Sequence, residues 1–183
     1  MRSDRMKSTQ IAMGGLSCAL ALILMFGTGL VPFAEYALPA IAGLVLIAMA
    51  QENGTKAALA AFLAISLLGL FVVPIKEAAC LFLFFFGHYP ILYSALQRLR
   101  PRLLRMLVKF AIFNVCVVCA YLVIIYAFGL TEILEEFGSF GRYSALVLLA
   151  LGNVFFVVYD KMVGNVTELY IRWFRPKLLK KMR

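Results

Sequence analysis

Residues 74–105 read PIKEAACLFLFFFGHYPILYSALQRLRPRLLR, and they carry the clearest structural signal in the chain. Between Glu77 and Leu96 the only charged residue is Glu77 itself. As a helix with a rise of about 1.5 Å per residue, this stretch is long enough to cross a hydrocarbon core of about 30 Å. Four arginines come next, at positions 98, 100, 102 and 105. Such a basic cluster is held on the cytoplasmic side of a membrane. The stretch therefore predicts a transmembrane helix whose acidic end, Glu77, faces outside.

A helix break is predicted in the middle of this span, at Gly87-His88-Tyr89-Pro90. The break lies about 16 Å from Glu77 by helical rise, which is near the middle of a bilayer. Proline has no N–H, so the carbonyl of Phe86 is expected to lose its helical partner. Many transporters build substrate sites from a broken helix with an ionisable residue at this depth. The alternative is a packing kink in which His88 bonds to a neighbouring helix.

Composition places the whole chain in the membrane. Of its 183 residues, 64% are hydrophobic and 15% are charged, which is too little polar surface for a soluble globule. We expect an all-α, polytopic protein of the bacterial plasma membrane, with residues 1–183 forming a single membrane domain in contact with the lipid bilayer. The six predicted spans cover about residues 11–31, 36–50, 57–73, 77–97, 106–128 and 143–163, and a basic cytoplasmic tail follows over residues 164–183.

The distribution of Lys and Arg predicts the orientation of these spans. If both termini are cytoplasmic, only Lys76 and Arg142 lie outside, and the other sixteen basic residues lie inside. The formal net charge of +9 then follows from sidedness, so no nucleic-acid partner is expected. The outer side carries an excess of acids, which favours a cationic or zwitterionic ligand.

Polar residues inside the apolar runs are the candidate substrate-binding groups. Asn114 and Asn153 lie about 14–15 Å into their helices by rise, at the level of His88. Glu35, Glu77, Arg142 and Tyr143 would line the outer mouth above these three groups. Buried polar groups need partners, so the three deeper residues form either the floor of an outward-opening cavity or interhelical contacts. Residues 129–142 form either a lid over this mouth or an interfacial turn.

Catalytic and metal-binding patterns are not found. The sequence contains no Gly-x-Ser-x-Gly, no His-Glu-x-x-His and no paired aspartates at depth. The four cysteines fall within apolar runs, where a cysteine usually behaves as a small hydrophobic residue. We therefore expect neither an enzyme nor a metal or cofactor site.

The first apolar run is rich in small residues, of which Gly15-x-x-x-Ala19 is the clearest pair. Small residues at this spacing let another helix approach closely. The chain resembles the substrate-binding S components of energy-coupling factor importers. The shared features are six spans in under 200 residues, cytoplasmic termini, a first helix rich in small residues after a basic tail, and no nucleotide-binding motif. Those proteins carry Ala-x-x-x-Ala on the first helix, whereas this chain has Gly15-Leu16-Ser17-Cys18-Ala19.

The resemblance implies a function and partners. It implies that Gly15 and Ala19 dock a transmembrane coupling subunit, that two ATPases supply the work, and that a vitamin or similar micronutrient binds near the outer face. The stretches EAACLFLFFFGHYPIL and NVFFVVYDKM also resemble uncharacterised bacterial six-helix membrane proteins. The alternative function is a non-catalytic membrane interaction or assembly protein with no small-molecule ligand.

Overall fold

The computed structural model describes residues 2–30, 34–129 and 144–177, and within these ranges every regular element is a helix. The expected all-α class is therefore confirmed for the described part of the chain. Five helices there are long and apolar enough to cross a membrane: Ile11–Gly29, Thr55–Val72, Lys76–Leu96, Arg102–Phe128 and Leu146–Lys177. A shorter apolar helix, Ala37–Glu52, lies at the predicted second span. The count of six crossings and the cytoplasmic placement of the termini stay predictions.

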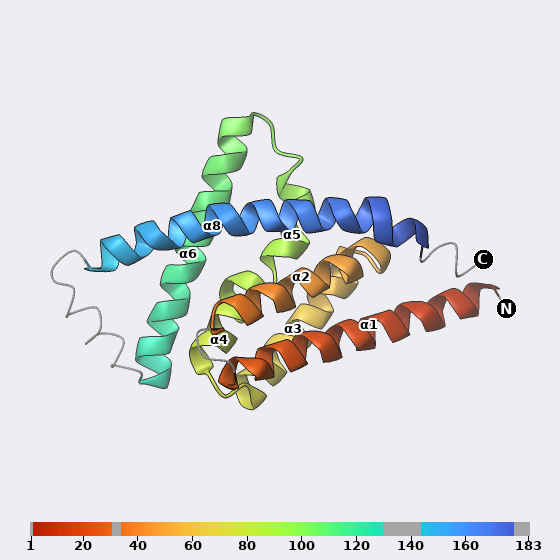
Figure 1. Ribbon diagram of the computed structural model, residues 1–183, viewed down its shortest axis with the longest axis horizontal. Coiled ribbons are helices and arrows are strands. Elements are labelled where there is room, and N and C mark those ends of the chain that lie inside the picture. The colour runs from red at the N-terminus through yellow and green to blue at the C-terminus, as the bar shows by residue number, and fades with distance from the viewer. Residues whose placement is uncertain (1, 31–33, 130–143, 178–183) are drawn as a thin grey trace.

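The helices form two groups, the first containing the three long helices of residues 2–72 and the second containing the helices that follow (Figure 1). The first group contains α1 (Arg2–Phe26), the short η1 (Gly27–Gly29), α2 (Ala37–Glu52) and α3 (Thr55–Val72). The second contains α4 (Lys76–Leu81), η2 (Phe82–Phe86), α5 (Tyr89–Leu96), α6 (Arg102–Phe128), α8 (Ser144–Leu169) and η3 (Tyr170–Phe174). In Figure 1, α8 runs along the long axis and α6 crosses it steeply, while the start of α1 and the end of η3 lie at the same end.

The segment α4–η2–α5 occupies the centre of the structure and is the most buried of the five long apolar helices. Phe82, Phe85 and Tyr89 are at most 1% exposed. The ring of Phe85 packs against Phe113 of α6 and Phe156 of α8, with centroids 5.1 and 5.9 Å away. The stretch with the clearest sequence signal is therefore also the element around which the other helices pack.

The predicted break in this helix is present, and it extends further than expected. A π-helical turn, η2, precedes it, and the N–H of Gly87 donates to the carbonyl of Phe82 at 2.8 Å. After a turn at Gly87 and His88, α5 begins with Pro90 in its first turn, where a missing N–H costs no helical bond. The hydroxyl of Tyr159 on α8 lies 3.4 Å from the carbonyl of Phe86 and also 3.4 Å from that of Ala40 on α2, so the two carbonyls share its single hydrogen.

Gly43 allows α2 to approach this break closely. A Cβ added at Gly43 would lie 2.0 Å from the backbone oxygen of Phe86 and 3.2 Å from the hydroxyl of Tyr159. No side chain, even a methyl group, fits there without moving backbone. Contact between α2, η2 and α8 therefore depends on the absence of a side chain at this position.

The end of the sixth predicted span differs from the structure. The sequence predicted that the span stops near residue 163, whereas α8 continues through Gly164 to Leu169 and into η3. Gly164 packs closely against α5, because a Cβ there would lie 2.6 Å from the hydroxyl of Tyr93. Helices α1 and α6 likewise begin before their predicted spans, at Arg2 and Arg102, because a helix can continue past the edge of the hydrocarbon.

We expect Gly43→Ala to destabilise the fold by about 1–3 kcal/mol, because the added methyl group overlaps a backbone carbonyl that cannot rotate away. The matched control is Gly15→Ala, since a Cβ at Gly15 meets nothing within 4 Å and alanine is the better helix former. Thermal unfolding of both variants in the same detergent measures the difference. Equal stability of the two variants would contradict the close approach.

Candidate functional site

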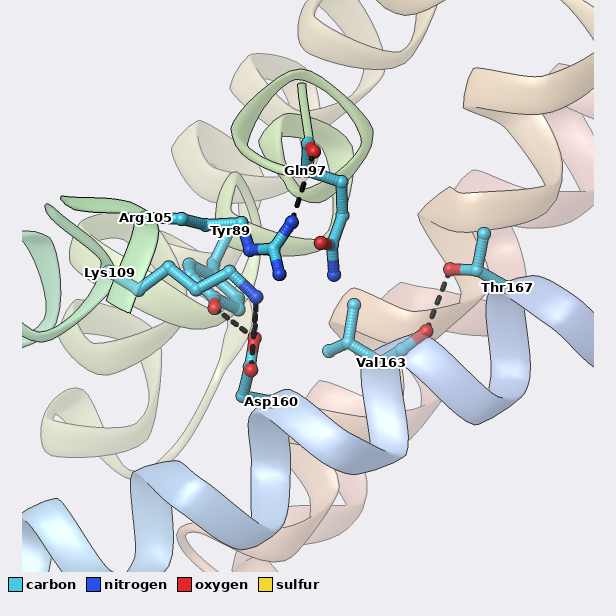
Figure 2. Close-up of polar contacts among 7 residues, drawn as sticks. All are labelled: Tyr89, Gln97, Arg105, Lys109, Asp160, Val163 and Thr167. Carbon is cyan, nitrogen blue, oxygen red and sulfur yellow. Dashed lines mark hydrogen bonds and ion pairs between the residues drawn. The ribbon is translucent and has the colours of Figure 1, made fainter. Parts of the chain in front are cut away.

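A buried ion pair with a tyrosine joins α5, α6 and α8, and we call Tyr89, Lys109 and Asp160 the inner cluster (Figure 2). The ammonium of Lys109 lies 2.7 and 3.0 Å from the two carboxylate oxygens of Asp160. Tyr89 donates its hydroxyl hydrogen to the same carboxylate. The ammonium also lies 4.3 Å from the centre of the Tyr93 ring, which adds a cation–π contact.

The inner cluster is enclosed by protein rather than displayed on the surface. Lys109 is 5% exposed, Tyr89 is fully buried, and the side chain of Asp160 is 26% exposed. An unpaired charge in an apolar interior is strongly unfavourable, so each ion here depends on the other. The charge distribution counted Lys109 among the sixteen basic residues of the inner side and did not indicate Asp160 as its partner. A lone lysine within the apolar run of α6 was the signal that could have identified the pair.

A second polar group consists of Tyr36, Glu77 and Tyr121, and we call it the outer cluster because the charge distribution predicts its side of the protein to be outside. One carboxylate oxygen of Glu77 accepts hydrogen bonds from both tyrosine hydroxyls, each at 2.8 Å. The two hydroxyl oxygens are 3.5 Å apart. Tyr36 donates to Glu77 although 44% of its surface is exposed.

The residues around the outer cluster leave it acidic. Glu35 precedes Tyr36 and is half-buried. Lys76 precedes Glu77, but its ammonium turns toward the end of α3 and donates to the carbonyls of Leu70 and Val73 at 2.9 and 3.1 Å. Among the described residues, no cation forms an ion pair with Glu77. Arg142 and Tyr143, the other two residues predicted at the mouth, lie outside the described residues.

Asn114 and Asn153 meet across α6 and α8. Each side-chain amide donates to the oxygen of the other, at 2.9 and 3.0 Å. Each also donates to the carbonyl four residues earlier in its own helix, that of Phe110 or Leu149, at 2.8 and 2.7 Å. Both donors of each amide group are thus used between protein groups, as in an interhelical contact.

The contacts of His88 differ from those of the two asparagines. Its Nε2 lies 3.9 Å from the thiol of Cys116, and its ring packs edge-on against Phe62 with centroids 5.8 Å apart. In the described part of the chain no hydrogen bond joins His88 to Asn114 or Asn153. Of the three groups predicted at one depth, the structure pairs the two asparagines and places the imidazole beside a thiol.

Gly15 and Ala19, the predicted docking pair, face outward from α1. Both are exposed, and a Cβ at Gly15 would meet nothing within 4 Å. A separate pocket of about 140 Å³ lies between α2 and α8. It is apolar and is lined by Ala37, Ala40, Ile41, Phe155, Val158, Tyr159 and Met162, so it contains none of the predicted substrate-binding residues. Among the described residues no three His, Cys, Asp or Glu side chains group as metal ligands, and all four cysteines are free.

Comparison of the chain with protein-family models, with curated proteins and with solved structures finds no match. The resemblance to energy-coupling factor S components therefore stays a prediction. It rests on the architecture expected from the sequence and on the small residues of the first helix.

Removing one partner of the inner cluster should be costly. We expect Lys109→Met to lower stability by about 3–5 kcal/mol, because Asp160 would keep its charge in an apolar surrounding with only Tyr89 as a donor. The double variant Lys109→Met with Asp160→Asn should recover much of this loss, since it removes the charge and keeps an acceptor for Tyr89. Chemical or thermal unfolding in detergent measures both.

The control is the exposed ion pair of Arg172 with Glu168, 2.7 Å apart. Arg172→Met should cost less than about 1 kcal/mol, because water screens an exposed pair. A cost for Lys109→Met no larger than this would show that the inner cluster does not stabilise the packing of α6 on α8.

Proposed function

We propose that the chain is an integral membrane subunit that captures a small micronutrient for an importer resembling the energy-coupling factor type. The observation that carries the proposal is the outer cluster, in which two tyrosine hydroxyls hold one carboxylate, Glu77. Its residues come from the start of α2, the first turn of α4 and the second half of α6. These are the helix ends that the charge distribution predicts to be outside.

The chemistry of this cluster suits a cationic or zwitterionic ligand. A carboxylate attracts an ammonium group, and the tyrosine rings beside it offer π faces to the same charge. Tyr36 is exposed, so an incoming molecule can reach the cluster without unfolding a helix. Deeper in the bundle, His88, Asn114 and Asn153 are the candidate floor groups, and ligand entry would require the asparagine pair to exchange its partners.

The same proposal assigns the exposed side of α1 to a partner. Gly15 and Ala19 leave a shallow surface on which the helix of a coupling subunit can pack closely. Two ATPases bound to that subunit would supply the work of import. Neither nucleic acid nor a cofactor takes part in this proposal.

The ligand-binding part is tested with Glu77→Gln, which removes the charge and keeps the shape. We expect the protein purified in a mild detergent to release a bound small molecule on denaturation, and the variant to retain about tenfold less of it, because a hydrogen bond to a charged group is lost. Mass spectrometry of the extract measures the amount. Glu168→Gln is the control, since Glu168 pairs with Arg172 and lies outside the outer cluster. Wild-type protein without any bound molecule, together with unchanged uptake in the Glu77 variant, would overturn ligand capture.

A second candidate is a membrane assembly protein that binds no ligand. The observation that favours it is the asparagine pair, because two amides that satisfy each other have no need of a substrate. The exposed side of α1 would then be the functional surface by itself.

Docking through α1 is tested with Gly15→Phe, which fills the space beside the helix. We expect co-purification of a defined transmembrane coupling subunit and its ATPases to fall about tenfold or more, whereas Leu151→Phe on the exposed side of α8 should leave it unchanged. Affinity purification of the co-expressed subunits, quantified on a gel, measures the complex. If both functions are present, Gly15→Phe reduces the complex but leaves bound ligand intact. A complex that depends on Gly15 in protein that never carries ligand favours the assembly protein.

A further inference from the structure

The first turn of α6 contains a positive charge with no acidic partner among the described residues. Arg105 is half-buried, and its guanidinium makes one hydrogen bond, a long one of 3.3 Å to the backbone carbonyl of Gln97. Within the described residues it forms no ion pair with a carboxylate. A guanidinium has five N–H donors in a planar fork, so most of its donors stay available here.

The acids of the neighbouring helices are already engaged by other groups. Asp160 is held by Lys109 and Tyr89 of the inner cluster. On the C-terminal half of α8, Glu168 pairs with Arg172, and Glu52 of α2 lies 3.3 Å from Arg175. Figure 2 shows the guanidinium of Arg105 beside the carboxamide of Gln97, on the same side of α8 as Lys109 and Asp160. This corner therefore combines two cations with one anion and keeps a local excess of positive charge.

The chemistry around Arg105 identifies the kind of molecule that would neutralise it. A phosphate group accepts two parallel hydrogen bonds from one guanidinium, which a soluble chloride ion cannot do. Arg98 and Arg100 in the turn before α6, and Arg102 at its start, are exposed and add attraction for anions. The occupant is therefore expected to carry a phosphate and a net negative charge.

The apolar side chains beside Arg105 favour a lipid over a soluble phosphate. The first turns of α6 expose Leu103, Leu104, Met106 and Leu107, with exposed fractions between 45% and 69%. The turn also joins two helices long and apolar enough to cross a membrane, so it belongs at the level of the headgroups. Here arginines at the headgroup level are followed along α6 by exposed leucines. A phospholipid has the matching arrangement, with its phosphate at the headgroup level and its acyl chains in the hydrocarbon.

We propose that Arg105, with the exposed arginines of the α5–α6 turn, binds the headgroup phosphate of an anionic phospholipid whose acyl chains lie against the start of α6. The lipid would hold this turn near α8, beside the inner cluster. This inference is independent of ligand capture at the outer cluster, and each can fail without the other.

The experiment measures thermal unfolding of the full chain in a neutral detergent with added phosphatidylglycerol, phosphatidylcholine or inorganic phosphate. We expect phosphatidylglycerol to raise the unfolding temperature of the wild type, and phosphatidylcholine or phosphate to raise it much less. Arg105→Gln should weaken the apparent affinity for phosphatidylglycerol about tenfold or more, because the bidentate contact is lost. Arg172→Gln is the matched control, since it removes an exposed arginine that already has a carboxylate partner, and it should respond like the wild type.

Two further measurements keep the test decisive. Arg105→Lys retains the charge without the planar fork and should respond between the wild type and Arg105→Gln, and it replaces the latter if that variant does not fold. Native mass spectrometry of the wild type should detect retained phosphatidylglycerol in preference to phosphatidylcholine. An unchanged response in the Arg105 variants overturns the site. An equal loss of affinity for phosphatidylglycerol in Arg172→Gln shows only diffuse charge attraction and also overturns the site. If inorganic phosphate raises the unfolding temperature as much as phosphatidylglycerol does, the site binds a soluble anion and the lipid proposal is overturned.

Discussion

A polar group inside hydrocarbon has no water to bond, and this constraint accounts for the polar contacts at the centre of the structure. The carbonyl of Phe86, which lies at the break before α5, meets the hydroxyl of Tyr159 from α8. Gly43 lets α2 lie against the same carbonyl. A break in one helix is therefore stabilised by two others, and the central position of α4–η2–α5 follows from that need.

The charged groups follow the same constraint in two ways. Lys109 and Asp160 neutralise each other inside the bundle, where separation would leave each ion without a partner. Glu77 instead lies at a helix end with two neutral donors and no cation among the described residues. The neutralised ion pair in the interior suits a structural role. Glu77, which accepts a hydrogen bond from the exposed Tyr36, suits the binding of a molecule that arrives from outside. This contrast is the reason that the proposed function rests on the outer cluster.

Part of the candidate site could be predicted from residue type and depth alone. Asn114 and Asn153 were expected at one level because each lies a similar number of residues from the end of its apolar run, and they do meet. His88 was expected at that level too, but the turn at Gly87 and His88 directs the ring to Cys116 and Phe62. Lys109 was missed because a count of basic residues assigns a side to each lysine and says nothing of an acid on another helix.

The sequence by itself determined the all-helical class, the apolar lengths of most spans and the existence of a break before Pro90, because these depend on composition and on local backbone chemistry. Only the tertiary structure decided the pairing of Lys109 with Asp160, the outward face of Gly15 and Ala19, and the continuation of α8 past Gly164. The physical reason is that a helix apolar on all sides has no polar face to set its rotation. Its rotation and crossing angle come from packing, as in the contact of Gly43 with the Phe86 carbonyl and of Gly164 with Tyr93.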